Sequence, residues 1–168
     1  FKLPDPIGEI LGGTKRPNGL VISKVRVPLG VIGMIYEARP NVTADAIALA
    51  IKTGNAVVLR GSSTTYHSNA AITSLLKEAG KNASLPEQAI QLLEDSSREG
   101  VDAFVKMKQY LSVIIPRGGA QLINRVVASS QVPTIETGVG NCHIYIDKAA
   151  NLNIAIPILI NAKVQRPS

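Results

Sequence analysis

Short apolar runs alternate with longer stretches of helical periodicity between residues 30 and 137, and this alternation restricts the fold more than any other feature of the sequence. The runs are rich in β-branched residues and are too short to be typical helices, as at residues 30–36 and 56–60. Such runs are typical of strands buried on both faces, and the helical stretches are typical of crossovers between parallel strands. The sequence therefore predicts an α/β fold with a Rossmann-like, doubly wound parallel sheet.

Glycines and polar capping residues between the runs predict where the individual helices and strands begin and end. Gly54 and Gly80 are expected to end two helices, which Thr43 and either Ser68 or Asn69 begin. The predicted strands are residues 30–36, 56–60, 89–93 and 112–116, with further strands beginning at 134–137 and 142–147. The predicted helices are residues 43–53, 68–80, 98–107, 120–129 and 151–163, the last capped by Asn151.

The first residues carry a different pattern. Residues 1–18 are interrupted by prolines and paired glycines and predict an extended lead-in, whereas residues 19–27 alternate as in a half-exposed strand. An exposed strand edge can pair with another subunit, which predicts a homo-oligomer. We therefore expect a lead-in and oligomerisation-type strand at residues 1–28, a dinucleotide-binding domain at 29–134 and the truncated start of a second α/β catalytic domain at 135–168.

Composition restricts the class of protein. No run approaches the ~20 apolar residues that a membrane-spanning helix needs, so we expect a soluble protein without a membrane partner. The chain begins with Phe1 and shows no targeting segment, which predicts a fragment or a processed chain. A single cysteine, Cys142, excludes an internal disulfide, which fits a location in the reducing cytoplasm. The separation of His67 from His143 predicts no metal site.

The net charge of +6 raises the question of nucleic acid. Lysine and arginine are scattered along the chain without a basic run or interleaved aromatic residues, so we expect no nucleic-acid partner. Phosphate-bearing small molecules explain the excess of positive charge equally well, and so does a solvated basic surface.

Candidate site residues follow the predicted strands, because open α/β sheets bind ligands at the carboxyl ends of their strands. One turn offers a cation and hydroxyls (Arg60, Ser62, Ser63), and another offers a cation and free backbone amides (Arg117, Gly118, Gly119), both suited to a phosphate. Each is also compatible with an ordinary polar turn. Asn41 and Glu136 follow two other strands, where a turn residue and a solvated carboxylate are the simpler interpretations.

Neither phosphate-type turn matches G-x-G-x-x-G, and the chain has no Walker A sequence, so a dinucleotide site here is of a different kind. Cys142 lies in a predicted strand. Because free cysteines are among the most often buried residues, we expect it to have a structural role.

Several consecutive blocks nevertheless resemble one family. The blocks VRVPLGVIGMIYEARPNVTADAIALAIKTGNAVVLRGSS, HSNAAI, IIPRGG, VPTIETGVGNCHIYID and NAKVQRPS are similar, in order and spacing, to those of the gamma-glutamyl phosphate reductases, also called glutamate-5-semialdehyde dehydrogenases. These enzymes belong to the aldehyde dehydrogenase superfamily. The resemblance covers almost the whole chain.

The resemblance implies a reaction and a cofactor. It implies NADPH-dependent reduction of gamma-glutamyl phosphate, an acyl phosphate, to glutamate 5-semialdehyde and phosphate on the way to proline, through a cysteine thioester. By this resemblance Arg60, Ser62 and Ser63 lie near the adenosine ribose, and Gly118 and Gly119 lie beside the pyrophosphate. An arginine at position 60 suits the 2′-phosphate of NADP(H). Asn41 matches the asparagine that stabilises the oxyanion, and Glu136 resembles the glutamate that activates water in hydrolytic relatives.

The sequence also departs from the pattern of the family. The nucleophilic cysteine of the family lies shortly after the Arg-Pro-Ser that ends this chain, so we expect it beyond Ser168 and expect this chain to be inactive alone. Cys142 occupies a different block. A reductase has to keep water from its thioester, so Glu136 stays a candidate catalytic residue whose role differs from that in hydrolytic relatives. The alternatives are a non-catalytic nucleotide-binding or assembly module of the same fold and, on net charge alone, a nucleic-acid binder.

Overall fold

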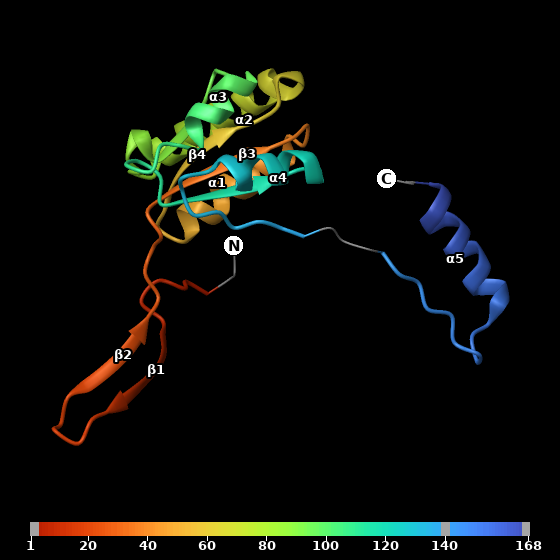
Figure 1. Ribbon diagram of the computed structural model, residues 1–168, viewed down its shortest axis with the longest axis horizontal. Coiled ribbons are helices and arrows are strands. Elements are labelled where there is room, and N and C mark those ends of the chain that lie inside the picture. Colours follow the sequence, from red (N-terminus) through yellow and green to blue (C-terminus); the bar gives the residue numbers. More distant parts are fainter. Residues whose placement is uncertain (1–3, 139–141, 166–168) are drawn as a thin grey trace. The chain divides into compact units, whose positions relative to one another are not determined.

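The computed structural model describes residues 4–138 and 142–165 and forms two compact units. The first unit spans residues 1–137 and contains a hairpin and a sheet flanked by helices, and the second spans residues 138–168. Both units can be followed along the chain in Figure 1. The domain boundaries expected from the sequence remain a prediction.

Four parallel strands form the sheet in the order β5-β4-β3-β6. They are β3 (Val31–Tyr36), β4 (Ala56–Arg60), β5 (Ile90–Leu92) and β6 (Val113–Arg117). Gly33 lies at the centre, paired with Val58 of β4 and with Ile114 of β6. The chain runs outward from β3 to β5 and then returns to the other side of β3, which creates a topological switch point between β3 and β6. The parallel α/β sheet predicted from the sequence is confirmed.

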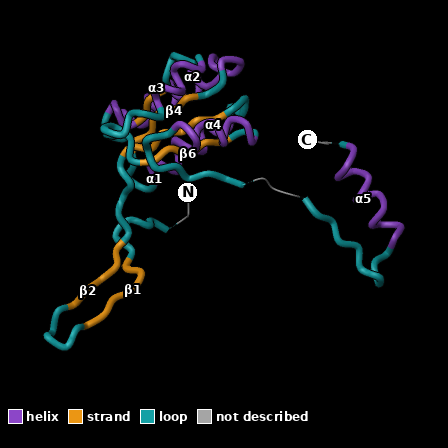
Figure 2. Tube along the Cα trace, viewed as in Figure 1, coloured by secondary structure: helices purple, strands orange, loops and turns teal. Residues whose placement is uncertain are grey.

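Helices cover the two faces of this sheet, as the tube in Figure 2 shows. One core combines α1 (Asn41–Lys52) and α2 (Tyr66–Asn82) with inward residues of the strands, among them Val57 and Leu59. The other combines α3 (Arg98–Phe104) and α4 (Ala120–Ser129), with Phe104 and Ile114 at its centre. Strands buried on both sides explain why the apolar runs are nearly continuous.

The predicted helix starts need correction. Helix α1 begins at Asn41, and Thr43 is buried and bonded to Tyr36, so Thr43 is not a cap. Helix α2 begins at Tyr66, which leaves Asn69 inside the helix and fully buried, and the helix continues past Gly80. Thr43 and Asn69 are of residue types that commonly cap helices, but here their side chains bond to buried partners instead. Gly54 follows α1 with a φ of +70°, which confirms the left-handed end predicted there.

The first part of the chain is a hairpin, not a lead-in followed by a lone strand. Strands β1 (Ile10–Lys15) and β2 (Val21–Val25) pair antiparallel. Paired glycines hide the strand pattern of β1, and cross-strand hydrogen bonds are a tertiary feature that a single segment does not reveal. Both strands are exposed along their whole length, whereas the sequence predicted one half-buried face.

The second unit contains one helix among its described residues, α5 (Leu152–Val164). Asn151 caps it as predicted, since its Oδ1 accepts a hydrogen bond of 3.0 Å from the Asn153 amide. The expected strand at residues 142–147 is wrong, because no strand among the described residues of this unit pairs with it, and Cys142 is exposed instead of buried. The strand expected at 134–137 is reduced to one bridge between Thr134 and Ile114.

No helix in the described parts of the chain is long and apolar enough to span a membrane. Within the same residues, no cluster of three or more histidine, cysteine, aspartate or glutamate side chains has the geometry of a metal site.

Candidate cofactor site

Glu37 and the turn after β6 meet at the switch point. The Glu37 amide donates to the Arg117 carbonyl (3.2 Å), and the Gly119 amide donates to Glu37 Oε2 (3.1 Å). A β-carbon at position 118 would lie 2.7 Å from Glu37 Cδ, so the carboxylate approaches this turn as closely as a glycine allows. Gly119 is the N-cap of α4, and the positive end of the helix dipole favours a negative group here. In this structure a carboxylate of the chain itself fills that role.

The turn after β4 presents two serines. The Ser62 side chain caps the short 3-10 helix at Ser63–Thr65, accepting a 3.3 Å hydrogen bond from the Thr64 amide. Ser62 is half-buried and Ser63 is exposed. The loop is therefore held by its own hydroxyls while its outer surface stays accessible.

Arg60, the last residue of β4, joins this turn to the loop that follows β5. Its Nη2 donates to the carbonyl of Ser96 and, at 2.9 Å, to that of Ser97. Its Nε is buried and has no partner among the residues that the structure describes. Burial lowers the pKa of Arg60, and the nearby carboxylate of Asp95 acts in the opposite direction. The guanidinium thus spans two loops and keeps an unused donor.

The loop after β5 leads into α3 through a pair of local hydrogen bonds. Asp95 accepts from the Ser97 amide (2.8 Å), and Ser97 caps α3 by accepting from the Gly100 amide (2.9 Å). Hydrogen bonds from Ser97 hold the pKa of Asp95 below its usual value. The carbonyls that receive Arg60 are therefore fixed by a structured loop.

These loops surround a cavity of about 520 Å³. Three of its lining residues are arginines and one is a carboxylate. Arg125 is paired with Asp102 at 2.7 Å, and this hydrogen bond raises the pKa of Arg125 and lowers that of Asp102. An excess of positive charge beside serine hydroxyls suits an anionic ligand. The cavity is lined by Glu37, Arg60, Ser62, Ser63, Ser96, Arg98, Val101, Gln121, Leu122 and Arg125.

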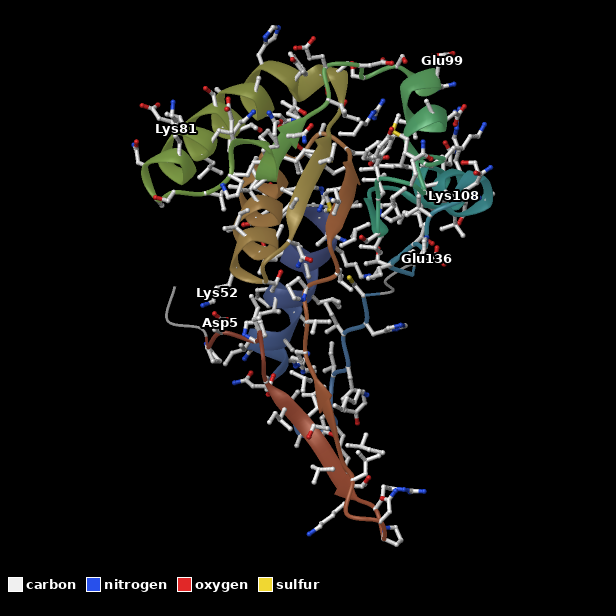
Figure 3. All side chains as sticks on the ribbon, turned by 90° about the vertical axis from the view of Figure 1, so that its left-hand side faces the viewer. Asp5, Lys52, Lys81, Glu99, Lys108 and Glu136 are labelled. Atoms are coloured by element: carbon white, nitrogen blue, oxygen red, sulfur yellow. The ribbon has the colours of Figure 1, made fainter. Side chains whose placement is uncertain are left out.

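The cavity lies at one end of the domain. Glu99, in the first turn of α3 beside Arg98, and Lys52, the last residue of α1, lie at opposite ends of the domain in Figure 3. The helices run back from the carboxyl ends of the strands, so the cavity is at the carboxyl edge of the sheet, where ligands of open α/β sheets bind.

The residues singled out in the sequence are brought together only in part. Arg60, Ser62 and Ser63 line the cavity. The turn of Arg117, Gly118 and Gly119 borders Glu37 but is not part of the lining.

The two residues expected near the reaction lie apart from the cavity lining. Asn41 is exposed at the start of α1, with its Nδ2 3.4 Å from Asp45 Oδ2, and Glu136 is exposed beyond the bridge at Thr134. Gly140 and Asn141, in the same predicted turn as Glu136, lie outside the described residues. The roles of all these residues remain predictions.

Sequence reasoning missed several lining residues. Glu37 directly follows β3, so its position at a strand end was a usable signal. Arg98, Gln121 and Arg125 come from helices, and only the packing of α3 and α4 brings them to the cavity. No local pattern distinguishes them from solvated surface residues.

The aldehyde dehydrogenase family model matches residues 7–166, so the chain belongs to the aldehyde dehydrogenase family. It is similar to gamma-glutamyl phosphate reductase of Geobacillus thermodenitrificans (strain NG80-2), with 60% identity over 166 residues, which are 99% of this chain and 40% of that protein. Among solved structures it is similar to the gamma-glutamyl phosphate reductase of Thermotoga maritima, with a TM-score of 0.85 and 48% identity over 99% of this chain and 40% of the other.

The enzyme of the same name from Saccharomyces cerevisiae has a TM-score of 0.68 and 28% identity, with coverage of 99% of this chain and 42% of that chain. The chain thus spans about two fifths of the length of these relatives.

Proposed function

We propose that the protein to which this chain belongs reduces L-glutamate 5-phosphate to glutamate 5-semialdehyde and phosphate, a step of proline biosynthesis, with NADPH as reductant. The observation that carries the proposal is the cationic, serine-lined cavity at the carboxyl edge of the sheet, in a chain 60% identical to a gamma-glutamyl phosphate reductase. The proposal places the cofactor in this chain and the substrate chemistry mainly in the rest of the protein.

The cavity fits the adenosine end of NADP(H). When bound, NADPH supplies the hydride. A 2′-phosphate would receive hydrogen bonds from Ser62 and Ser63 and from the Arg60 guanidinium where it lines the cavity. Arginine presents donors in a planar fork that matches phosphate geometry, which supports NADPH over NADH. The pyrophosphate would lie beside the Gly118–Gly119 turn, where it would replace the Glu37 carboxylate at the Gly119 amide, and Arg117 is exposed beside this turn.

The reaction requires a thiolate and an oxyanion donor. The thiolate of a cysteine attacks the acyl carbon, phosphate leaves, and reduction of the thioester followed by release of the thiolate yields the aldehyde. We assign the oxyanion donor to Asn41, whose amide at a helix start is exposed and makes only a long 3.4 Å hydrogen bond among the described residues. Comparable donors contribute roughly 3 kcal/mol to catalysis. Cys142 belongs to another block, so we place the nucleophile after Ser168 and expect this chain alone to be inactive.

The test uses the full-length protein, assayed for consumption of NADPH with L-glutamate 5-phosphate and also in the reverse direction. Incubation with glutamate 5-semialdehyde, phosphate and NADP+ should produce NADPH, and NAD+ should be a poorer substrate. Replacing the first cysteine after Ser168 by alanine should abolish the reaction, and replacing Cys142 should not. A full-length protein that binds NADPH without either reaction would be the non-catalytic nucleotide-binding module instead.

We further propose that two copies assemble in the cytoplasm through the β1–β2 hairpin. Its strands are exposed throughout, with Ile10 66% and Val21 65% exposed, and an exposed apolar strand is suited to pairing with a second copy. Val21→Lys should shift the full-length protein toward the monomer in light-scattering measurements. An unchanged mass would contradict the proposed interface.

A further inference from the structure

A chain of buried hydrogen bonds connects the core of the sheet to the serine loop of the cavity. Tyr36 Oη lies 2.7 Å from Thr43 Oγ1, which donates to Asn69 Oδ1 at 3.1 Å. Asn69 Nδ2 then donates to Thr65 Oγ1 (3.2 Å), which donates to the Ser62 carbonyl (3.4 Å). Because the Thr43 proton is used on Asn69, the phenol must donate to Thr43. The bonds therefore run in one direction, from β3 to the loop.

The middle of this chain is sealed from solvent. Thr43 and Asn69 are 0% exposed and Tyr36 is 1% exposed. Burial raises the pKa of Tyr36, which keeps the phenol protonated as the donor that the chain needs. Buried amides and hydroxyls are unfavourable unless they are bonded, and here each of them is.

Asn69 also packs directly beneath the loop. A β-carbon at position 61 would overlap Asn69 Nδ2 and would lie 3.2 Å from Tyr36 Cζ. An asparagine inside a helix is neither a good helix former nor an apolar core residue, so helix formation and core packing do not explain it. Its two bonded ends join the core to the carbonyl of a residue that lines the cavity.

We propose that Asn69 is a positioning residue that fixes Ser62 and Ser63 for the 2′-phosphate of the cofactor, acting through Thr65. This inference rests on the proposed use of NADP(H). The residues of the site would then have two different roles. Arg60 and the serines would contact the phosphate, and Asn69 would determine where the serine backbone lies. Loss of Asn69 should therefore reduce the discrimination in favour of the 2′-phosphate more than it reduces binding of adenosine itself.

Calorimetric titration with adenosine 2′,5′-bisphosphate and with AMP tests this. The dissociation constant of AMP divided by that of the bisphosphate reports the contribution of the 2′-phosphate, and this ratio is larger when the 2′-phosphate strengthens binding. Asn69→Ala removes the two middle bonds of the chain, and Thr65→Val removes its last two bonds with almost no change in volume. Each should reduce the ratio about tenfold, the equivalent of one charge-assisted hydrogen bond. Because Thr65→Val leaves Asn69 in place, it should fold even if Asn69→Ala does not.

The matched control is Thr73→Val, one turn further along α2. Thr73 is 4% exposed and its Oγ1 has no partner among the described residues, so this variant changes a buried hydroxyl of the same helix outside the chain of bonds. It should leave the ratio unchanged. Selective binding by the wild type with an unaltered ratio in Thr65→Val would overturn the positioning role alone. If the wild type does not prefer the bisphosphate over AMP, the proposed cofactor site fails as well.

Discussion

Replacing Glu37 by glutamine should weaken the fold slightly while tightening the binding of a phosphorylated nucleotide. In the free protein the carboxylate accepts the Gly119 amide at 3.1 Å and faces the positive end of α4. Loss of its charge should therefore lower the free energy of unfolding by roughly 0.3–1 kcal/mol, the usual size of a charge–dipole interaction at a helix terminus. The same change removes a negative charge from the wall of the cavity.

The gain in binding follows from the size of the cavity. A volume of about 520 Å³ places any phosphate in it within roughly 10 Å of the Glu37 carboxylate, and at that separation a dianion in a water-like dielectric is repelled by about 1 kcal/mol. Removing this repulsion should tighten the binding of adenosine 2′,5′-bisphosphate about fivefold. The effect should shrink as salt is added, because the Debye length falls to about 10 Å at 0.1 M.

The assay combines thermal unfolding with calorimetric titration of the 168-residue chain at low ionic strength. Glu78→Gln, an equal change of charge on α2 away from this cavity, is the control and should alter neither measurement appreciably. Weaker nucleotide binding in Glu37→Gln would refute the reasoning, because it would mean that the carboxylate binds the nucleotide, for example through a ribose hydroxyl, and does not repel it.

Three further changes test the packing and the charges. Thr73→Val removes a buried hydroxyl without a partner among the described residues and should stabilise the fold by about 1 kcal/mol, or about 4 °C in Tm, whereas Thr73→Ser should lower Tm. Leu59→Ala, at a position 0% exposed, should cost about 2–5 kcal/mol in denaturant unfolding. The hydrogen bond from Arg125 lowers the pKa of Asp102 from 3.8, so its stabilisation is present above that pH and is lost as the pH falls through the folded-state pKa. Asp102→Asn should therefore unfold at a slightly lower temperature than the wild type at pH 7, and at the same temperature in strong acid. A difference in Tm that persists in acid would contradict this assignment.

The regular part of the fold was readable from the sequence because its signals are local. Helix α4 runs from Ala120 to Ser129, as its periodicity predicts, and β4 runs from Ala56 to Arg60, as its apolar run predicts. Strand β1 and the true start of α2 at Tyr66 could not be predicted from the sequence. Strand β1 depends on pairing with β2, and Asn69 makes buried hydrogen bonds inside α2 instead of capping it.

The sequence by itself determined the alternation of strands and helices, the turns that carry Arg60 and Gly118, and the order of blocks shared with one enzyme family. These depend on residue type and spacing along the chain. Tertiary structure alone decided that Arg98 and Arg125 reach the cavity of Arg60, and that the Glu37 carboxylate occupies the start of α4. The physical reason is that β6 joins the sheet beside β3, so the loops at this edge come from distant parts of the sequence and meet only after the sheet has formed.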